Sequence, residues 1–594
     1  MIKNRYHFSL AIILVLGFSL TAAGQRDTTK LNQDVEVVKA YRPSVANAEK
    51  VNQLPEIDDT TRFTPEFNYQ INSRPVTSGF GATPISAAKI QGQSKSTQGY
   101  GLLKAGIGNY STPYGELFFN KPGSKNGTFG LHLKHLSSQG SVKLDAGEKV
   151  DAPYSHSTAE IFGSIIRPKV TLSADLSYNR DATRYYGYPT EIPDDILTHS
   201  SSPFFGDKQW YQKGRLNFSV KDNGGKDSKL NYHTGLFLQY FGALTDQKEK
   251  SGGVFANFRY DANLVQAFLE TSFENYNTDS VNYYLNYGLP LTSQKRSWLA
   301  IKPSAQLSGD NWKVRVGVNF YSVFDKKGDN NTKMFPKLDL EFTPVEKIMT
   351  LYAGLDGHLQ NNHLSAITAE NPWVNPAVDV APTDMQLIAF GGIKGLITNG
   401  LTYRIGIKYS KANDQYFYVM KYFDPMTYLL NNPANSYYDN AFMVTYDNTS
   451  TVDFSGELTY SKGDQLFVTL SGHYFNYSTE QLDVASGMPQ FTVNVTSKYR
   501  LTNRITAFTD IDITGKREMM AGAYLPPWSS LAPPAPFYVK LDPYVNIKLG
   551  ADYQLMNNLK LFGRVDNLLK QHYDYFLGYR AQGLRLMVGA ALRF

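Results

Sequence analysis

Most of this chain consists of segments in which apolar and polar side chains alternate one by one. In the final segment, "GLRLMVGAALRF" (583–594), Leu586 and Val588 share one parity, and Arg585 and Arg593 share the other. Successive side chains of a β-strand point to opposite faces, so this pattern predicts a strand with different surroundings on its two faces. A soluble sheet would turn the apolar face to a core. An outer-membrane barrel would turn it to lipid and its other face to a wet lumen.

The spacing of the alternating segments favours the barrel. Segments such as "RPKVTLSADLSYNR" (167–180) and "YDANLVQAFLETSF" (260–273) each contain two strands joined by a tight turn. The gaps between such hairpins are mostly much longer and rich in Asn, Asp, Pro, Gly and aromatic residues; they fall at 181–209, 276–295, 325–332, 361–384, 413–438, 478–487 and 516–537. Short turns on one side and long loops on the other are typical of an outer-membrane barrel.

The predicted fold is therefore all-β: a transmembrane antiparallel β-barrel of about 22 strands over residues 98–594. This count treats 439–460 as one long strand, although "DNTST" within it could interrupt the pairing. An even count places both ends of the barrel on the short-turn, periplasmic side. We expect Phe594 to act as a C-terminal signal for the outer-membrane assembly machinery, and the last strand to close against the first and leave no edge.

The N-terminal residues predict export. "MIKNRYHFSLAIILVLGFSLTAAGQ" begins with Lys3 and Arg5, continues with an apolar run and ends in small residues, which is the order of a secretory signal peptide. The apolar run is shorter than the about 20 residues of a membrane-spanning helix. We expect a cleaved signal peptide over 1–24, a short periplasmic or lumenal segment over 25–97, and a barrel surrounded by the lipid of a Gram-negative outer membrane.

Three stretches resemble the TonB-dependent receptors. "RVDNLLKQHYDYF" (564–576) is similar to their penultimate strand at Val565, Asn567, Leu568 and Tyr573. "ENPWVNPAVDVAPTDMQLIAFGG" (370–392) is similar to their loop-to-strand motif at Asn371, Pro372, Val374 and Pro376, with valine in place of the usual leucine. "QDVEVVKAYRPSVANAEKVNQLPEI" (33–57) resembles a TonB box that runs into a plug, with its core at Val35, Glu36, Val37 and Val38.

This resemblance implies transport of an unknown ligand across the outer membrane, with TonB as a partner. A TonB box is an extended segment that pairs edge-on with a strand of TonB and so transmits force. The alternative is that "VEVV" is only a short strand. The family's receptors also hold a folded plug in the barrel, and residues 25–97 are too few for one. Residues 58–97 show no sustained strand or helix pattern, so the resemblance implies a plug that is reduced or missing.

No pattern in the chain predicts catalysis. The ten histidines are scattered, there is no cysteine, and no spacing resembles a zinc site. His132 and His135 are close in sequence, but their opposite parity would point them to opposite faces of one strand. The formal net charge of +6 is too mild to favour a nucleic acid as a partner. We expect no catalytic residue, no metal site and no cofactor, and therefore no enzyme.

Aromatic residues predict both membrane boundaries and a contact surface. Trp210, Trp298 and Trp312 open predicted strands, as expected of aromatic girdles at the two membrane interfaces. Loops 414–439 and 519–538 are unusually apolar for exposed segments, which favours contact with a ligand or with another outer-membrane or surface protein. The candidate contact residues in the outer loops are Trp373, Tyr416, Tyr418, Tyr422, Tyr428 and Trp528. Alternatively, these loops fold inward, pack on each other and close the mouth.

Three functions fit these features. The first is TonB-linked import of a nutrient. The second is a non-transporting accessory barrel that scaffolds outer-membrane partner proteins. The third is a passive pore, although a lumen of about 22 strands would leak unless something filled it. We therefore expect the outer loops or residues 25–97 to occlude the lumen.

Overall fold

The computed structural model describes most of the predicted barrel, namely residues 100–121, 126–144, 147–187, 207–224, 228–262, 264–279, 293–325, 331–375, 378, 380–423, 440–523 and 537–594. The predicted signal peptide (1–24) and the segment 25–97, with its TonB-box-like stretch, lie outside the described residues. Among the helices of the described part, none is long and apolar enough to cross a bilayer.

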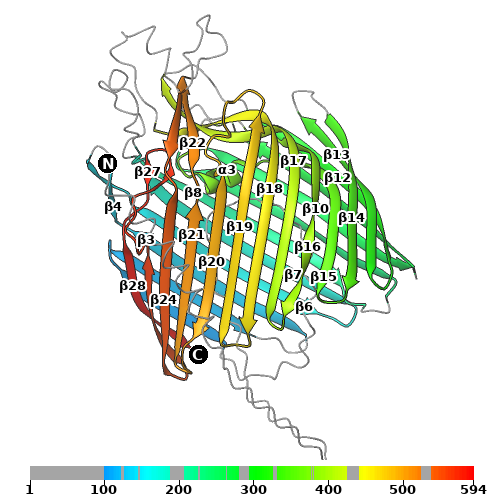
Figure 1. The fold of residues 1–594 in the computed structure, drawn as a ribbon, viewed down its shortest axis with the longest axis horizontal. Coiled ribbons are helices and arrows are strands. Elements are labelled where there is room, and N and C mark those ends of the chain that lie inside the picture. Colours follow the sequence, from blue (N-terminus) through cyan, green and yellow to red (C-terminus); the bar gives the residue numbers. More distant parts are fainter. Residues whose placement is uncertain are drawn as a thin grey trace, which may run out of the picture. The chain divides into compact units, whose positions relative to one another are not determined.

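Twenty-two antiparallel strands form a closed wall (Figure 1), as the sequence predicts. Closure is direct: β1 pairs with β28, and the Gly101 backbone N–H donates to the Phe594 carbonyl oxygen at 2.8 Å. The wall strands are β1 (Gly101–Gly108), β2 (Thr112–Lys121), β3 (Gly127–Ser138), β6 (Tyr154–Ile166), β7 (Val170–Arg184), β8 (Lys208–Asp222), β9 (Leu230–Ala243), β10 (Lys248–Ala262), β11 (Val265–Thr278), β12 (Lys295–Ser308), β13 (Trp312–Asp325), β14 (Asn331–Val345), β15 (Met349–Gln360), β16 (Thr383–Thr398), β17 (Leu401–Phe423), β18 (Phe442–Lys462), β19 (Leu466–Thr479), β20 (Phe491–Arg500), β21 (Ile505–Thr514), β24 (Tyr544–Met556), β25 (Leu559–Asp566) and β28 (Arg585–Arg593).

The two faces of the wall have the predicted character. On β28, Leu586 and Val588 are 46% and 62% exposed on the outer face, whereas Ala591 is buried on the inner face. On β3, His132 lies 3.1 Å from Glu116 inside the barrel, and His135 bonds the Ser157 hydroxyl on the opposite face. An apolar outer face and a polar lumen follow from period-two alternation in a closed sheet.

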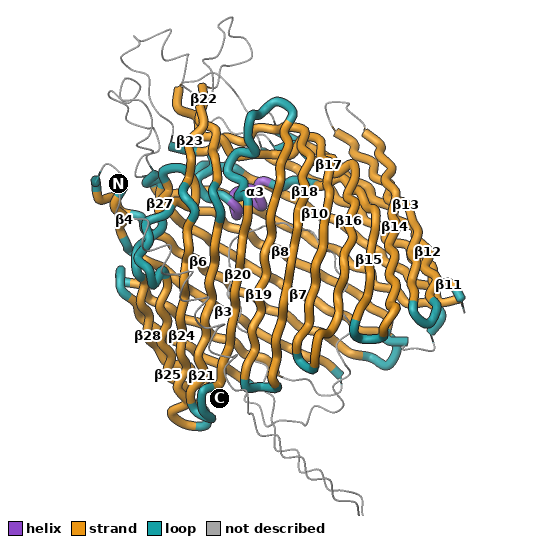
Figure 2. Tube along the Cα trace, viewed as in Figure 1, coloured by secondary structure: helices purple, strands orange, loops and turns teal. Residues whose placement is uncertain are grey.

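The turns are sorted by length between the two ends of the barrel. One end carries turns of two to seven residues, and the other carries the long loops, including 185–207, 361–382 and 515–543 (Figure 2). Strand β18 runs without interruption, so the prediction of one long strand over 439–460 is confirmed. Gly101 and Phe594 pair with each other, so the first strand starts and the last strand ends at the short-turn end.

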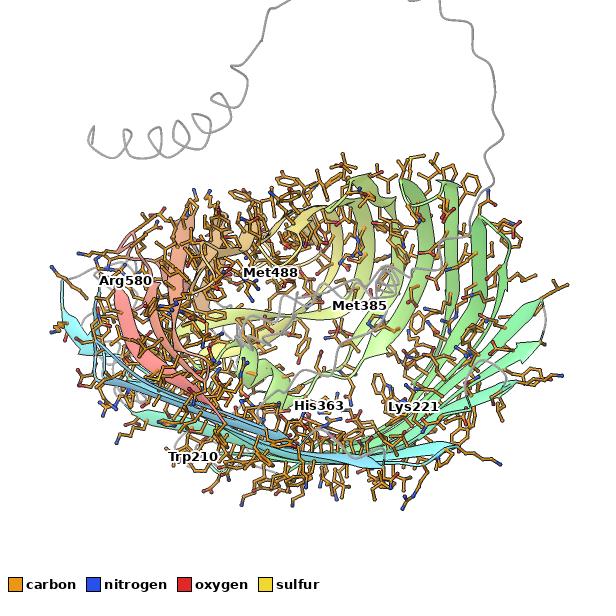
Figure 3. The ribbon with its side chains drawn as sticks, turned by 90° about the horizontal axis from the view of Figure 1, so that it is seen from below. Trp210, Lys221, His363, Met385, Met488 and Arg580 are labelled. Atoms are coloured by element: carbon orange, nitrogen blue, oxygen red, sulfur yellow. The ribbon has the colours of Figure 1, made fainter. Side chains whose placement is uncertain are left out.

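The tryptophans follow the girdle pattern only in part. Trp312 is 41% exposed on the outer face at the short-turn end. Trp210 lies at the long-loop end, with the Arg180 guanidinium 5.3 Å from its ring centre, and Figure 3 places it on the outside of the wall. The prediction is wrong for Trp298, which is 6% exposed and packs inside the barrel against Tyr321. Trp298 occupies a position of β12 whose side chain points to the lumen. The face of the strand, and not nearness to the strand's start, therefore decides its surroundings.

The long-loop end has secondary structure of its own. Helix α3 (Leu364–Glu370) lies in the loop between β15 and β16. The hairpin of β22 (Arg517–Ala523) and β23 (Phe537–Leu541) extends from the loop between β21 and β24, and β22 pairs in parallel with the end of β17. The long-loop end also carries two smaller, separate hairpins. One is formed by β4 (Ser141–Lys143) with β5 (Lys149–Asp151), and the other by β26 (Asp574–Phe576) with β27 (Tyr579–Arg580).

Candidate functional site: the loop assembly at the mouth

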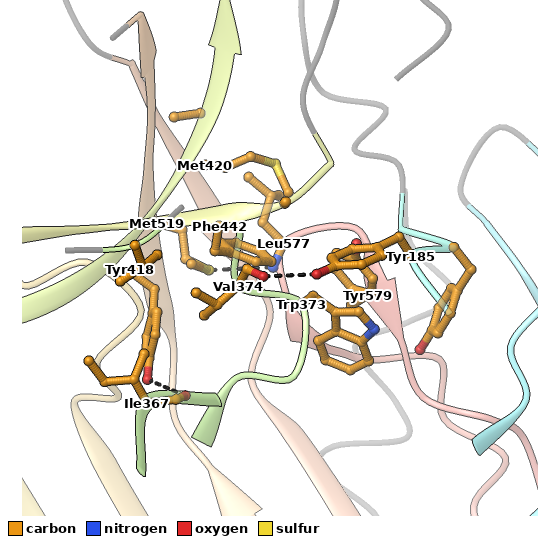
Figure 4. Close-up of a cluster of buried hydrophobic side chains, with 14 of the residues drawn as sticks. Tyr185, Ile367, Trp373, Val374, Tyr418, Met420, Phe442, Met519, Leu577 and Tyr579 are labelled. Atoms are coloured by element: carbon orange, nitrogen blue, oxygen red, sulfur yellow. Dashed lines mark hydrogen bonds between the residues drawn. The ribbon is translucent and has the colours of Figure 1, made fainter. Parts of the chain in front are cut away.

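The long loops share one hydrophobic cluster, called here the loop cluster (Figure 4). Its members come from loops and strand ends at the long-loop end that are far apart in sequence: Val142, Leu144, Val150, Ala152, Tyr185, Tyr186, Tyr211, Phe241, Ala243, Leu364, Ile367, Trp373, Val374, Val378, Val380, Tyr416, Tyr418, Met420, Ala441, Phe442, Met519, Ala521, Val539, Leu541, Leu577 and Tyr579. Burial of apolar surface stabilises such a cluster by about 25 cal/mol per Å². The loops therefore form a packed assembly at the mouth of the barrel.

Tyr579 lies at the centre of the loop cluster. Its ring stacks on Trp373, with ring centres 4.1 Å apart, and meets the edge of Tyr186 at 5.2 Å. Its hydroxyl donates to the Asn440 carbonyl oxygen at 2.5 Å, and the Asn440 amide donates to the Tyr185 carbonyl oxygen at 3.0 Å. A buried tyrosine needs such a partner for its hydroxyl, so these contacts determine how the loops fit together.

Three tyrosines hold the loop 361–382. Tyr185 donates to the Val374 carbonyl oxygen at 2.9 Å, Tyr211 to that of Pro372 at 3.0 Å, and Tyr418 to that of Ile367 at 3.0 Å. They come from the loop after β7, from β8 and from β17. The loop is therefore held from several sides of the wall by hydrogen bonds, with no covalent link.

Of the six candidate contact residues in the outer loops, three are buried in the loop cluster and three have side chains outside the description. Trp373, Tyr416 and Tyr418 are 7%, 9% and 5% exposed and belong to the loop cluster. In this conformation they are packed within the loop cluster and present little surface to a partner. Tyr422 lies on β17, but its side chain is outside the description, as are Tyr428 and Trp528 altogether.

A charged network anchors α3 to the wall below it. His363, which precedes the helix, lies 3.0 Å from a Glu274 carboxylate oxygen and 3.6 Å from one of Glu249. Ser365 donates its backbone N–H and its hydroxyl to Glu249, at 3.2 and 2.8 Å, and Tyr276 donates to the same carboxylate at 3.1 Å. Glu249 is fully buried, and the Gln239 amide also donates to it at 3.2 Å. Figure 3 shows His363 on the inner side of the wall.

The charge on His363 follows from this environment. Burial opposes it, but the carboxylates of Glu249 and Glu274 outweigh burial and raise the pKa of His363 to about 9. At neutral pH the network therefore contains an imidazolium between two carboxylates. The Arg296 guanidinium lies 4.8 Å from the Tyr276 ring centre and donates to the Asn362 carbonyl oxygen at 3.3 Å. The start of the loop is thus bound to β10, β11 and β12.

The receptor-like motif within residues 370–392 holds the loop 361–382 in shape. Asn371 is fully buried, and its side-chain oxygen accepts from the Trp373 backbone N–H at 3.0 Å. Val374 forms a bridge with Phe442, so the loop is tied to the start of β18. Pro372 offers its carbonyl oxygen to Tyr211, and Pro376 lies outside the described residues.

The receptor-like motif at residues 564–576 holds the loop between β25 and β28. Asn567 has a positive φ of 52°, a conformation that asparagine tolerates better than most residues. Its side chain donates to the carbonyl oxygens of Gln571 and Gln582, at 3.0 and 3.2 Å, and accepts from the Gln571 N–H. Tyr573 stacks on Tyr544 with ring centres 4.0 Å apart. The Leu568 backbone N–H donates to the Ile547 carbonyl oxygen at 3.0 Å, and the Leu568 side chain is 39% exposed. Val565 pairs with Leu549 and Leu586 within the wall.

The anchoring residues carry no sequence signal that reveals their role. Glu249, Glu274 and His363 lie on separate segments, and each is unremarkable among its neighbours in sequence. The described residues contain no group of three or more His, Cys, Asp or Glu that could hold a metal ion. The arrangement is suited to holding loops across a mouth, which is a mechanical role.

These features define the class of the protein. A closed barrel of 22 antiparallel strands, apolar outside and polar inside, with long loops packed at one end, has the architecture of a transmembrane β-barrel. No protein-family model and no curated protein matches the sequence.

Solved structures nevertheless share the fold. The pyoverdine outer membrane receptor FpvA from Pseudomonas aeruginosa PAO1 is similar at a TM-score of 0.59 and 13% identity, over 84% of this chain and 80% of its own. The siderophore receptor PirA from Acinetobacter baumannii has a TM-score of 0.59 at 12% identity, over 84% and 81%. The FrpB iron transporter from Neisseria meningitidis has a TM-score of 0.59 at 11% identity, over 84% and 82%.

Proposed function

We propose that this barrel transports a ligand across the outer membrane of a Gram-negative cell, and that the loop assembly is the gate through which the ligand enters. The observation that carries the proposal is the loop cluster: loops from around the mouth meet in one packed assembly held by non-covalent contacts. Such contacts can separate and re-form, as a gate requires. The similar structures include an iron transporter and a copper transporter, which supports a transport role.

We further propose that TonB supplies the force, through the segment Val35, Glu36, Val37 and Val38. An extended segment can add a strand to a partner's sheet, and that pairing depends on its backbone donors. Proline has no backbone N–H and would remove one ladder bond, whereas alanine would remove only a side chain.

The test compares Val37→Pro with Val37→Ala in cells that depend on the transported nutrient. We expect the proline variant to lose ligand accumulation and the alanine variant to keep most of it, with equal amounts of assembled barrel in the outer membrane. Wild-type growth and accumulation in both variants would show that this segment is not a TonB box.

A second candidate is an accessory barrel that scaffolds outer-membrane partner proteins. The small size of the segment 25–97 and the dense packing of the loop cluster favour it. Purification from outer membranes in mild detergent, followed by mass spectrometry, separates the two. Recovery of TonB supports transport, and a stable outer-membrane or surface protein supports the scaffold. A passive pore would instead show steady conductance in planar bilayers.

A further inference from the structure

A cavity of about 160 Å³ opens from the inner face of the wall between β11 and β15. A single buried water needs roughly 10–15 Å³ measured in the same way, so the cavity has room for a small solute. Its lining is polar and charged, and it includes Lys302, Arg315, Asn319 and Lys337. The cavity is separate from the loop cluster and from the network around His363.

Two of the cations at the cavity are already neutralised. Arg315 lies 3.1 Å from a Glu270 carboxylate oxygen and donates to the Ser304 hydroxyl at 2.9 Å. Lys337 lies 3.3 Å from Asp356, which also accepts from the Asn319 amide at 2.7 Å. These pairs hold the side chains in place and leave the lining close to neutral.

Lys302 adds a positive charge to this lining. Its ammonium lies 5.2 Å from the ring centre of Tyr321, and its direct register partner on β11 is Glu270, the carboxylate that pairs with Arg315. The side chain is half-buried on β12, so its charge is partly withdrawn from water. A half-buried cation beside a polar cavity attracts an anion more strongly than one in open solvent.

We propose that this cavity binds a small oxyanion, such as phosphate or a carboxylate, with Lys302 as its principal charged contact. The Arg315 guanidinium and the Lys337 ammonium, held by their carboxylate partners, would flank the anion on neighbouring strands. Charge-assisted hydrogen bonds from ammonium and guanidinium groups are the strongest available to an oxyanion. The site lies on the lumen wall, along the path of a solute that has passed the loops, and it does not depend on coupling to TonB.

The test is calorimetric titration of the purified full-length chain in detergent micelles with inorganic phosphate, repeated with acetate, at low ionic strength. Lys302→Met should weaken phosphate binding by about tenfold or more, as loss of a charge-assisted contact predicts, and Lys302→Arg should stay close to wild type. The matched control is Lys498→Met. Lys498 is also half-buried in the lumen, with its ammonium 6.0 Å from the ring centre of Phe508.

The outcomes are distinct. Loss of binding in Lys302→Met, with wild-type affinity in Lys498→Met, supports the site. Whichever of phosphate and acetate binds the wild-type protein with higher affinity is the preferred oxyanion. Equal losses in both variants would assign binding to the general charge of the lumen and overturn the proposal. So would wild-type affinity in Lys302→Met, or the absence of binding to wild type at millimolar concentrations of both anions. Heat-modifiable migration on gels verifies that each variant is folded.

Discussion

Single residues in this barrel connect parts of the chain that lie far apart in sequence. His363 is the clearest case, because its imidazolium joins the loop before α3 to carboxylates on β10 and β11. Its pKa in the folded protein is raised to about 9 from an ordinary value near 6.5. The stabilisation from this charge is therefore complete below the ordinary value and is lost as the pH rises through about 9.

The anchoring of α3 should consequently weaken in alkaline solution. We expect the wild-type barrel to show low conductance in planar bilayers at neutral pH and an increase as the pH passes about 9. His363→Gln should conduct more at neutral pH and show little further change, because it has no charge to lose. His363→Lys, which retains a charge to higher pH, serves as the control and should remain closed. Identical pH profiles for wild type and His363→Gln would contradict this role for the histidine.

At the scale of elements, the loop 361–382 is the part most suited to blocking the mouth. It is held by Tyr185, Tyr211 and Tyr418 and by the network at its start. Its flanking residues, Gln360 and Thr383, are direct register partners on β15 and β16. A two-residue turn can join such a pair without disturbing the strands.

Replacing residues 361–382 by Asn-Gly should therefore preserve the barrel and open the lumen. We expect a several-fold rise in single-channel conductance with unchanged heat-modifiable migration. The comparison replaces residues 139–153 by Asn-Gly between the register partners Ser138 and Tyr154. It removes Val142, Leu144, Val150 and Ala152 from the loop cluster but leaves the loop 361–382 in place, so we expect a smaller rise in conductance. If the first replacement leaves conductance low, other loops or residues 25–97 occlude the lumen without this loop.

At the scale of the whole molecule, the barrel depends on one seam. The backbones of Gly101 and Phe594 exchange hydrogen bonds of 2.8 and 3.0 Å, and a Cβ on Gly101 would lie 2.2 Å from the Phe594 ring. A side chain at position 101 would therefore displace the Phe594 ring from its place at the seam.

Deletion of Phe594 and the substitution Gly101→Val should both impair assembly. The deletion removes the terminal aromatic and its hydrogen bonds, and valine would clash with the ring across the seam. Gly115→Val on β2 is the matched control, because a Cβ there meets no atom within 4 Å. The measurement is the fraction of protein in the outer membrane that migrates as the folded form without boiling. Normal assembly without Phe594 would contradict its role as an assembly signal.

Much of the wall could be predicted from the sequence, because its pattern is local. The parity of Leu586 and Val588, the single long strand β18 and the sorting of turns follow from alternation and turn residues. Trp298 was misjudged, because its parity faces the lumen and its position at a strand start does not reveal this. The burial of Trp373 and Tyr416 could not be derived from the apolar character of loops alone, since that character fits an exposed surface and a packed interior equally well.

The strand pattern and the two faces of the wall are thus properties of the sequence, because each residue's face depends only on its neighbours along one strand. The loop cluster, the network of His363 with Glu249 and Glu274, and the cavity beside Lys302 exist only in the tertiary structure. Their members are separated by long stretches of chain and carry no shared period. They meet because closure of the barrel places distant strand ends around one mouth and distant side chains around one lumen.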